Sequence, residues 1–361
     1  MKLVMTVAAR DEADVIGAQL AFHLNAGVDF VIATDHRSTD GTTEIFREFE
    51  RAGYLELIAE TGSDYPQSEW VTKMARLAAT KHGADWVINS DADEFWYPRG
   101  GNLKEVLALV PPRYGVIQAF FRHFVARPDD ERPFFERLTT RLAPSDPMTD
   151  PTAEYATFEK VIHRAMPDVR VGAGNHTVAG VGLALLRGWY PVELFHFPLR
   201  SSDQAERKFV HAKTATAGTA RDAKFRGSSH RWHAAAQAGT VGDLYRSLVV
   251  SDEELARGAR DGVFVEDVRA RDALRALAAV KGEPQAAGFA LPAAQARLEF
   301  QRPGLVDELE YAAEAALTDG ADIVRLQRRV DRLEARLNAR ERSVGRRLSA
   351  ALRRARTGDG P

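Results

Sequence analysis

The first 125 residues alternate between short apolar runs and longer amphipathic segments, and this alternation most constrains the fold. Apolar residues at helical spacing predict helices over 14–25, 42–52 and 68–82. The apolar runs predict strands at 3–8, 30–34, 54–59, 86–89 and 116–121. Strands that alternate with helices form βαβ units, whose parallel strands are covered by helices on both faces. We therefore predict an α/β fold with a mostly parallel sheet flanked by helices.

The composition excludes several classes of protein. The chain has no cysteine, which excludes disulfides, thiolate metal sites and cysteine nucleophiles. Its 49 Lys and Arg residues nearly balance 51 Asp and Glu residues, so it is no polycation built to bind nucleic acid. No apolar stretch reaches the roughly 18 residues of a membrane span, and the short apolar start lacks the features of a signal peptide. We expect a cytoplasmic protein without nucleic acid as a partner.

Carboxylate clusters follow three of the predicted strands, at 10–12, 35–40 and 91–94. In open α/β sheets, ligands bind in the crevice beyond the carboxyl ends of the strands. Asp91 and Asp93 are two residues apart after an apolar strand, a spacing that lets both bind one hard divalent cation. The sequence contains neither a P-loop motif nor the glycine motif of dinucleotide-binding folds. A cation that bridges a diphosphate is the simplest interpretation; the alternative is that both aspartates only cap the turn.

Two of these segments resemble a known family. Residues 34–42, Thr-Asp-His-Arg-Ser-Thr-Asp-Gly-Thr, resemble the Asp-x-x-Ser-x-Asp-Gly-Thr segment of family 2-like glycosyltransferases. Residues 91–95, Asp-Ala-Asp-Glu-Phe, are similar to the Asp-x-Asp motif of the branch in which Glu-Phe follows. The resemblance covers residues 1–125 well and 155–215 loosely. It implies the Rossmann-like GT-A fold and a nucleoside diphosphate sugar as the donor.

The resemblance implies roles for the first two clusters. Asp35 would bind the nucleobase or ribose of the donor, and Asp11, in the partly matching segment 10–12, would also contact the donor. Asp40 is interpreted as holding the turn and capping the helix that starts at Thr42.

The same resemblance makes the third cluster the metal and catalytic motif. Asp91 would lie beside the ribose and the metal, and Asp93 would be the direct ligand of Mn²⁺ or Mg²⁺. Asp93 and Glu94 are predicted to be catalytic, with Glu94 orienting its neighbours or touching the donor sugar. The cation would offset the charge that grows on the leaving nucleoside diphosphate.

Further candidates lie in the second half of the chain. Residues 196–208 are similar to the His-x-Pro-x-Arg-Ser…Gln-x-x-x-Lys tract of the same branch. This similarity implies that His196 is the third metal ligand, and that Arg200 and Lys208 pair with the diphosphate. His176 is an alternative third ligand.

The catalytic base stays open. An inverting transfer needs a carboxylate that takes the proton from the acceptor hydroxyl. Many family members use a Glu-Asp pair, and none occurs at 130–200. Glu154 is the predicted catalytic residue from this region, with Asp150 and Glu193 as the alternatives.

Three regions are predicted along the chain. Residues 1–210 form the nucleotide-sugar-binding GT-A domain, and 211–320 form a mainly helical addition with a plausible linker at 282–304. Residues 321–361 combine a short coiled-coil heptad pattern with a basic amphipathic tail. We expect a homo-oligomer through 322–340. The tail suits an anionic membrane surface, which adds a peripheral position at the inner face of the membrane to the cytoplasmic location.

The predicted function is a metal-dependent, inverting glycosyltransferase that moves a sugar to a hydroxyl of a glycan, polysaccharide or lipid-linked acceptor. One alternative is a nucleotidyltransferase of similar fold, although residues 8–12 lack the glycine-rich loop that such enzymes usually carry after the first strand. The other is a non-catalytic coiled-coil scaffold. The intact Asp35, Asp91, Asp93 and His196 argue against a decayed site of that kind.

Overall fold

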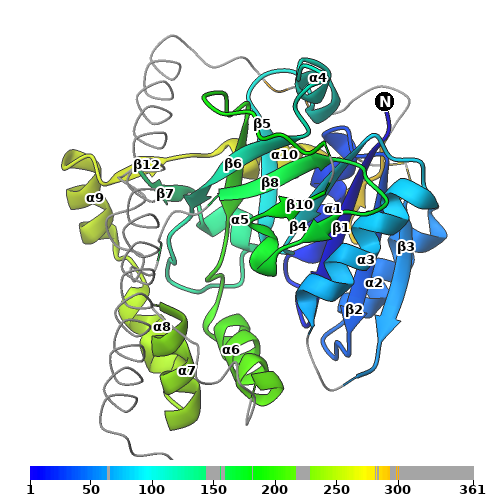
Figure 1. Cartoon of the computed structure of the whole chain (residues 1–361). Helices are drawn as coiled ribbons and strands as arrows, with labels where there is room; N and C mark the ends of the chain where they lie inside the picture. The colour runs from blue at the N-terminus through cyan, green and yellow to red at the C-terminus, as the bar shows by residue number, and fades with distance from the viewer. Residues whose placement is uncertain are drawn as a thin grey trace, which may run out of the picture.

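The structure is a computed structural model that describes residues 1–62, 66–143, 155, 159–180, 182–216, 228–280, 282, 284–292, 298 and 300 (Figure 1). Strands and helices alternate up to the fourth strand, and the order then becomes irregular. The elements are, in chain order, β1 (Leu3–Ala9), α1 (Ile16–Asn25), β2 (Phe30–His36), α2 (Thr42–Arg51), β3 (Leu55–Glu60), α3 (Gln67–Thr80), β4 (Trp86–Ser90), β5 (Glu94–Pro98), α4 (Leu103–Ala108), β6 (Val116–His123), α5 (Phe134–Arg137), β7 (Thr140–Leu142), β8 (Glu159–Arg164), β9 (Arg170–Val171), η1 (Ala173–Asn175), β10 (Val178–Ala179), β11 (Val192–His196), α6 (Ser202–Thr216), α7 (Ser228–Ala238), α8 (Val241–Leu248), α9 (Asp252–Arg260), β12 (Phe264–Glu266), α10 (Arg269–Ala278), β13 (Gln285–Ala286) and β14 (Phe289–Ala290).

An eight-stranded sheet with the order β3-β2-β1-β4-β8-β6-β11-β5 forms the centre of the fold. β1 to β4 pair in parallel, and so do β6 and β11. β8 lies antiparallel between β4 and β6, and β5 closes one end of the sheet antiparallel to β11. The prediction of an α/β fold with a mostly parallel sheet flanked by helices is confirmed.

These strand directions gather many chain segments at one edge of the sheet. The carboxyl ends of β1, β2, β4, β6 and β11 lie there, together with the amino ends of the reversed strands β5 and β8. The three carboxylate clusters follow β1, β2 and β4, so they meet at this edge. We call it the carboxyl edge of the sheet.

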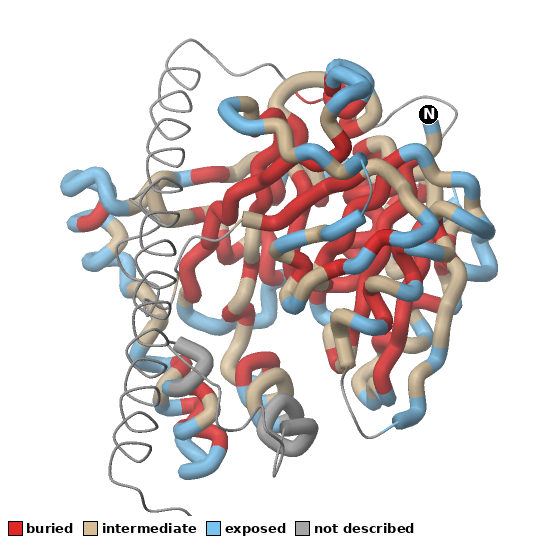
Figure 2. The backbone as a smooth tube through the Cα atoms, viewed as in Figure 1, coloured by how far each residue is buried: buried red, intermediate tan, exposed pale blue. Residues whose placement is uncertain are grey.

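Both faces of the sheet are buried (Figure 2). In β1, Leu3, Met5 and Val7 pack into the core under α1 and α2, whereas Val4 and Ala8 pack into the core under α3. A strand covered on both faces needs apolar side chains in both directions, which explains the nearly continuous apolar run. The core therefore consists of two layers that hold the sheet rigid beneath its carboxyl edge.

The described part of the segment predicted as a linker at 282–304 instead contributes to this core. Its hairpin β13–β14 packs against α1, and Ala286 and Ala290 are buried. A Cβ atom on Gly17 would lie 2.6 Å from the Cβ of Ala287, so a glycine in α1 permits the close approach. The glycine and proline residues correctly indicated a turn, but the prediction that this hairpin is an exposed connection was wrong.

Helices α6, α7 and α8 form a small unit beyond the carboxyl edge (Figure 1). Its own core includes Trp232, Val241 and Tyr245, and the ring of Phe209 stacks on Trp232 with centroids 4.1 Å apart. Leu199, which follows β11, belongs to the same core. The unit is thereby attached to the strand that carries His196.

The structure corrects other expectations. β5 was not predicted as a strand. β12 pairs with β7, and α10 packs against α1, so this part of the predicted helical addition contacts elements of the first 210 residues. The predicted coiled coil and basic tail lie outside the described residues. In the part of the chain that is described, no helix has the length and apolarity to span a membrane.

A network of buried ion pairs joins β11 to β6, β7 and the start of α10. Glu193 pairs with Nε of Arg122 at 3.0 Å and with a terminal nitrogen of Arg269 at 2.6 Å. Asp267 pairs with Arg141 at 2.8 Å and with Arg269 at 2.6 Å. Burial alone would raise the pKa of Glu193, but the two arginines lower it from 4.5 to about 2. Glu193 is thus a structural anion and is not placed as a catalytic base.

Replacing Glu193 by Gln should destabilise the fold, because Arg122 and Arg269 would lose a buried negative partner. We expect the free energy of unfolding, measured by urea denaturation, to fall by about 3 kcal/mol. The matched control is Glu44→Gln, since the Glu44–Arg47 pair on α2 is exposed and its two charges are 3.8 Å apart. The control should change stability by less than about 0.5 kcal/mol.

The stability difference between the wild type and Glu193→Gln should depend on pH. A carboxylate whose folded pKa is depressed stabilises the fold fully above its unfolded pKa, and this contribution is lost as the pH falls through the folded pKa. For Glu193 the loss runs from pH 4.5 towards about 2. The difference in stability between the wild type and Glu193→Gln should therefore shrink between pH 6 and pH 3. A difference that stays constant over this range would contradict the assignment.

Candidate functional site

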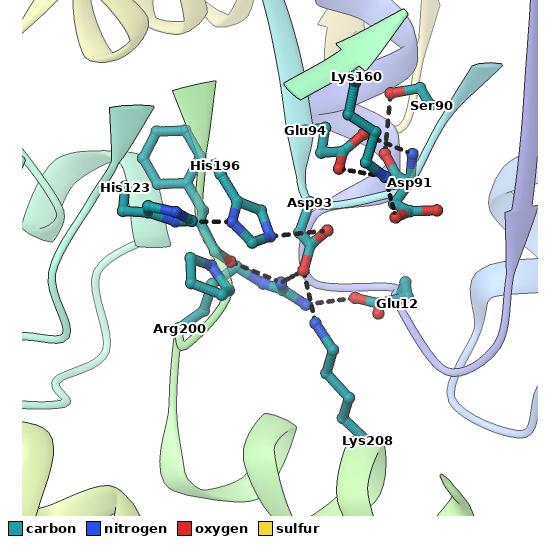
Figure 3. Close-up of polar contacts among 12 residues, drawn as sticks. Glu12, Ser90, Asp91, Asp93, Glu94, His123, Lys160, His196, Arg200 and Lys208 are labelled. Carbon is teal, nitrogen blue, oxygen red and sulfur yellow. Dashed lines mark hydrogen bonds and ion pairs between the residues drawn. The ribbon is translucent and has the colours of Figure 1, made fainter. Parts of the chain in front are cut away.

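Asp93 lies at the centre of a group of charged side chains at the carboxyl edge (Figure 3). It occupies the turn between β4 and β5 and is 3% exposed. The ammonium nitrogen of Lys208, from α6, is 2.6 Å from Oδ2, and a terminal nitrogen of Arg200 is 3.8 Å from the same oxygen. Nε2 of His196, the last residue of β11, is 3.6 Å from Oδ1. Burial would raise the pKa of Asp93, but Lys208, His196 and Arg200 hold it well below its usual range.

Arg200 is a buried cation that binds several parts of the site together. Its Nε donates to Asp14 at 2.7 Å, one terminal nitrogen donates to Glu12, and the other donates to the carbonyl of Phe197 at 3.0 Å. The side chain is 1% exposed. We predicted that Arg200 pairs with a diphosphate, but in this structure its donors are used within the protein.

Glu12 is a neighbour of Asp93 that the sequence analysis left without a role. It follows β1, and burial raises its pKa to about 7, although Arg200 and Lys208 act in the opposite direction. The one sequence feature that indicated a role for Glu12 was its position in the carboxylate cluster at 10–12. The resemblance directed attention to Asp11 instead.

Asp91 faces away from Asp93, towards the start of β8 (Figure 3). Its Oδ2 accepts a hydrogen bond from Lys160 at 2.6 Å. Its Oδ1 accepts from the side-chain amides of Gln67 at 3.0 Å and Asn175 at 3.1 Å. Gln67 and Asn175 were missed, because both come from distant segments and neither lies in a motif.

Glu94 and Lys160 form a buried ion pair behind Asp91. Lys160 is 2% exposed, and its ammonium nitrogen is 2.7 Å from Oε1 of Glu94. Oε2 of Glu94 accepts a hydrogen bond from the backbone N–H of Asp91 at 2.9 Å. Burial raises the pKa of Glu94 to about 8, despite the opposing effect of Lys160. In this structure Glu94 holds the turn that carries the Asp-x-Asp motif.

Asp11 and Asp35 organise the loops after β1 and β2. Asp11 accepts a hydrogen bond from the backbone N–H of Thr39 at 2.7 Å, and so connects the two loops. Asp35 accepts hydrogen bonds from the hydroxyls of Ser38 at 2.5 Å and Thr43 at 2.8 Å. Both carboxylates lie at the carboxyl edge, as the strand pattern predicts. Their contacts with a donor stay predictions.

The turn before α2 is held by Asp40, as predicted. Its Oδ1 accepts from the backbone N–H and the hydroxyl of Thr42, at 3.1 and 2.7 Å. Its Oδ2 accepts from the N–H of Ala13 at 3.0 Å.

Backbone strain is concentrated around these loops. Non-glycine residues rarely adopt positive φ, yet Asp11 has φ 54°, Arg37 has φ 58° and Asn175 has φ 61°. Of the four such residues among those described, only Ala287 lies outside this region. Strained backbone persists where the surrounding structure enforces it, and it is typical of functional sites.

His196 is held between β6 and Asp93. Its Nδ1 is 3.0 Å from Nδ1 of His123, which occupies the paired position on β6. Its ring also stacks on Phe121 with centroids 4.6 Å apart. His176, the alternative third ligand, contacts the carbonyl of Glu159 through Nδ1 at 2.7 Å. The structure therefore places His196 beside Asp93.

The donor set fits a divalent cation only in part. Asp93 Oδ1 and His196 Nε2 are 3.6 Å apart, and an oxygen and an imidazole nitrogen that face each other are suitable ligands for Mn²⁺. Among the described residues, no three His, Asp or Glu side chains converge to hold a metal ion. A cation that keeps waters and binds substrate phosphates needs only one or two protein ligands. Asp93 and His196 satisfy that requirement, and Asp91 is not brought to the same position.

The candidates for the catalytic base are not brought to the site in the described part of the chain. Glu154 and Asp150 lie outside the described residues, so the prediction for Glu154 stays open. Glu193 is engaged by Arg122 and Arg269.

One family model matches part of the chain. The model of glycosyltransferase family 92 matches residues 9–168, which is less than half of the sequence. The matched region includes the loops after β1 and β2, the Asp-x-Asp turn and β8. The match supports a glycosyltransferase, while the resemblance to the family 2-like branch stays a prediction.

The chain is also similar to solved structures. A complex of S. aureus TarS 1–349 with UDP is 15% identical, and the similarity covers 76% of this chain and 90% of that chain at a TM-score of 0.34. The complex of TarS 1–349 with UDP-GlcNAc is 13% identical, with the same coverage and TM-score. A mycobacterial protein is 15% identical over 60% of this chain and 73% of that chain, at a TM-score of 0.29. These scores are too low to support a function. No curated protein matches the chain.

Replacing Lys160 by Met should destabilise the protein increasingly above pH 8. In the wild type, Glu94 ionises at a pKa of about 8 beside the Lys160 ammonium. Without that cation, the buried carboxyl must stay protonated to higher pH, and the fold loses stability as the pH rises. We expect the stability difference between the wild type and Lys160→Met to be larger at pH 9.5 than at pH 7, by urea denaturation. Lys73→Met, which changes an exposed lysine on α3, should show no such trend.

Proposed function

We propose that the chain is a glycosyltransferase that transfers a sugar from a nucleoside diphosphate sugar to a hydroxyl group of a glycan or lipid-linked acceptor. The observation that carries the proposal is the meeting of Asp93, His196 and Lys208 at the carboxyl edge. A carboxylate, an imidazole and a movable ammonium suit the diphosphate of such a donor. The family 92 match, which includes Asp93, supports this interpretation.

The donor nucleoside would lie over the loops after β1 and β2. Asp11 and Asp35 hold these loops in strained conformations, so the surface they present is preorganised. Asp91 would contact the ribose, because its carboxylate is about a third exposed while its other neighbours fix its direction.

The donor diphosphate would lie between these loops and α6. Among the described residues, Lys208 is a cation that can reach it, because its side chain is 33% exposed. Arg200 does not contact the donor directly in this arrangement. It holds Glu12 and Asp14 and adds a positive field next to Asp93. Such preorganised charges stabilise developing charge without reorganising during the reaction.

Asp93 and His196 would hold Mn²⁺ or Mg²⁺ together with water and phosphate oxygens. When bound, the cation would offset the charge that develops on the leaving nucleoside diphosphate. The acceptor hydroxyl attacks the anomeric carbon, the bond from that carbon to the phosphate oxygen breaks, and a carboxylate takes the hydroxyl proton. We propose an inverting outcome with Glu154 as that base.

The test is a thermal denaturation panel with nucleoside diphosphate sugars, such as UDP-glucose, UDP-N-acetylglucosamine, GDP-mannose and dTDP-rhamnose, with and without Mn²⁺. A donor at 100 times its dissociation constant should stabilise the protein by about 2.7 kcal/mol. Asp93→Asn should remove this shift in thermal stability. It should also lower the rate at which nucleoside diphosphate is formed from the donor by about 100-fold. Glu44→Gln, an exposed carboxylate on α2, is the control and should leave both unchanged. A panel in which no donor shifts the wild type would contradict the proposal.

A further inference from the structure

We propose that Lys208 competes with the divalent cation for the charge of Asp93 while no donor is bound, and moves to the donor diphosphate when the cation enters. Lys208 would then be the positioning residue that makes cation binding depend on the donor. The inference rests on the proposed function, since it concerns the cation and the diphosphate of that site.

The ammonium group of Lys208 already lies against the carboxylate that would bind the cation. The nitrogen of Lys208 is 2.6 Å from Oδ2 of Asp93, while His196 faces the other oxygen of the same carboxylate. A cation held by Asp93 and His196 would thus share a single carboxylate with the ammonium. Like charges repel, and the repulsion is poorly screened here because Asp93 is 3% exposed. The ammonium therefore weakens the binding of a cation for as long as it stays on Asp93.

Arg200, another positive neighbour of Asp93, is fixed in place. Arg200 is bound to Glu12, Asp14 and a backbone carbonyl, so its movement would leave two buried carboxylates unpaired. His196 is held by β-sheet pairing and by its contacts with His123 and Phe121. Neither side chain can withdraw without disrupting the sheet edge.

Lys208 is free of such constraints. Among the described residues, the hydrogen bond to Asp93 is the only one that its ammonium makes. A third of its side chain is exposed, and a lysine stem has four flexible carbons. It can therefore leave Asp93 by rotation of its own side chain, without movement of α6.

The positive charge of Lys208 indicates which partner it takes after it leaves Asp93. A lysine that leaves Asp93 for water loses a charge-assisted hydrogen bond, which opposes cation binding. A diphosphate bound at the same edge offers phosphate oxygens as the replacement partner. The donor thus removes the competitor from Asp93, and the cation makes the lysine available to the donor. By linkage, each ligand must strengthen the binding of the other by the same factor.

The experiment measures Mn²⁺ binding by electron paramagnetic resonance of the free ion, first without nucleotide. Lys208→Met keeps the apolar stem and removes the charge, so it should bind Mn²⁺ roughly tenfold more tightly than the wild type. Lys208→Arg keeps the charge and should bind as weakly as the wild type. Lys73→Met, whose lysine pairs with Glu60 on the surface, controls for the loss of one positive charge from the chain.

The second arm adds UDP, GDP, ADP or dTDP, with correction for Mn²⁺ that the nucleotide binds in solution. At least one nucleotide should tighten Mn²⁺ binding to the wild type, and the tightening should be smaller in Lys208→Met. Circular dichroism and thermal denaturation verify folding, and Lys208→Gln replaces Lys208→Met if the latter does not fold.

The inference is overturned if, without nucleotide, the charge-removing variant binds Mn²⁺ no more tightly than the wild type, or if neither binds it. It is also overturned if the nucleotide effect is undiminished in that variant. The first arm uses no donor and no transfer reaction. A protein that transfers no sugar can therefore still show the expected difference, and an active glycosyltransferase can fail to show it, so the two proposals fail separately.

Discussion

The guanidinium group of Arg200 is the constraint on which the geometry of the site depends. It comes from the segment after β11 and binds Glu12 and Asp14 from the loop after β1, with Asp93 from the β4–β5 turn close by. A buried guanidinium is tolerated only when its charge and its donors are satisfied, and the same is true of these carboxylates. The guanidinium and the carboxylates therefore need one another, and the relative positions of the three segments that carry them are determined together.

A second buried cation, Lys160 on β8, has a similar arrangement of partners. Lys160 lies between Asp91 and Glu94, so it contacts the two acids of the Asp-x-Asp-Glu motif that face β8. The reversed directions of β5 and β8 make this possible, because both strands begin at the edge where the parallel strands end. Two cations are thus parts of the framework, and Lys208 is the partly exposed one at the surface of the site.

The sequence predicted the frame of the fold well. The alternating pattern identified β1 to β4 and α1 to α3, because a strand buried on both faces and an amphipathic helix leave distinct periodicities. It did not identify β5, whose five residues directly follow the turn and pair only with β11. Nor did it predict β13–β14, since glycine and proline mark a turn without indicating whether the turn is exposed.

Several residues of the candidate site were predicted from the sequence, but their arrangement was not. The spacing of Asp91 and Asp93 suggested one shared cation, whereas the structure turns Asp91 towards Lys160 and Asp93 towards Lys208. Local spacing cannot reveal this difference, because the partners come from β8 and α6, which lie 69 and 115 residues further along the chain.

The sequence by itself determined that carboxylates follow the parallel strands, and therefore that they meet at one edge of an α/β sheet. It also marked the tract from His196 to Lys208 as the second contributor to that edge. Only the tertiary structure decided which charges are paired in the core and which stays accessible. The physical reason is that strand order and direction set the neighbours of each side chain, and burial decides whether a charge must be matched within the protein or can be offered to a ligand.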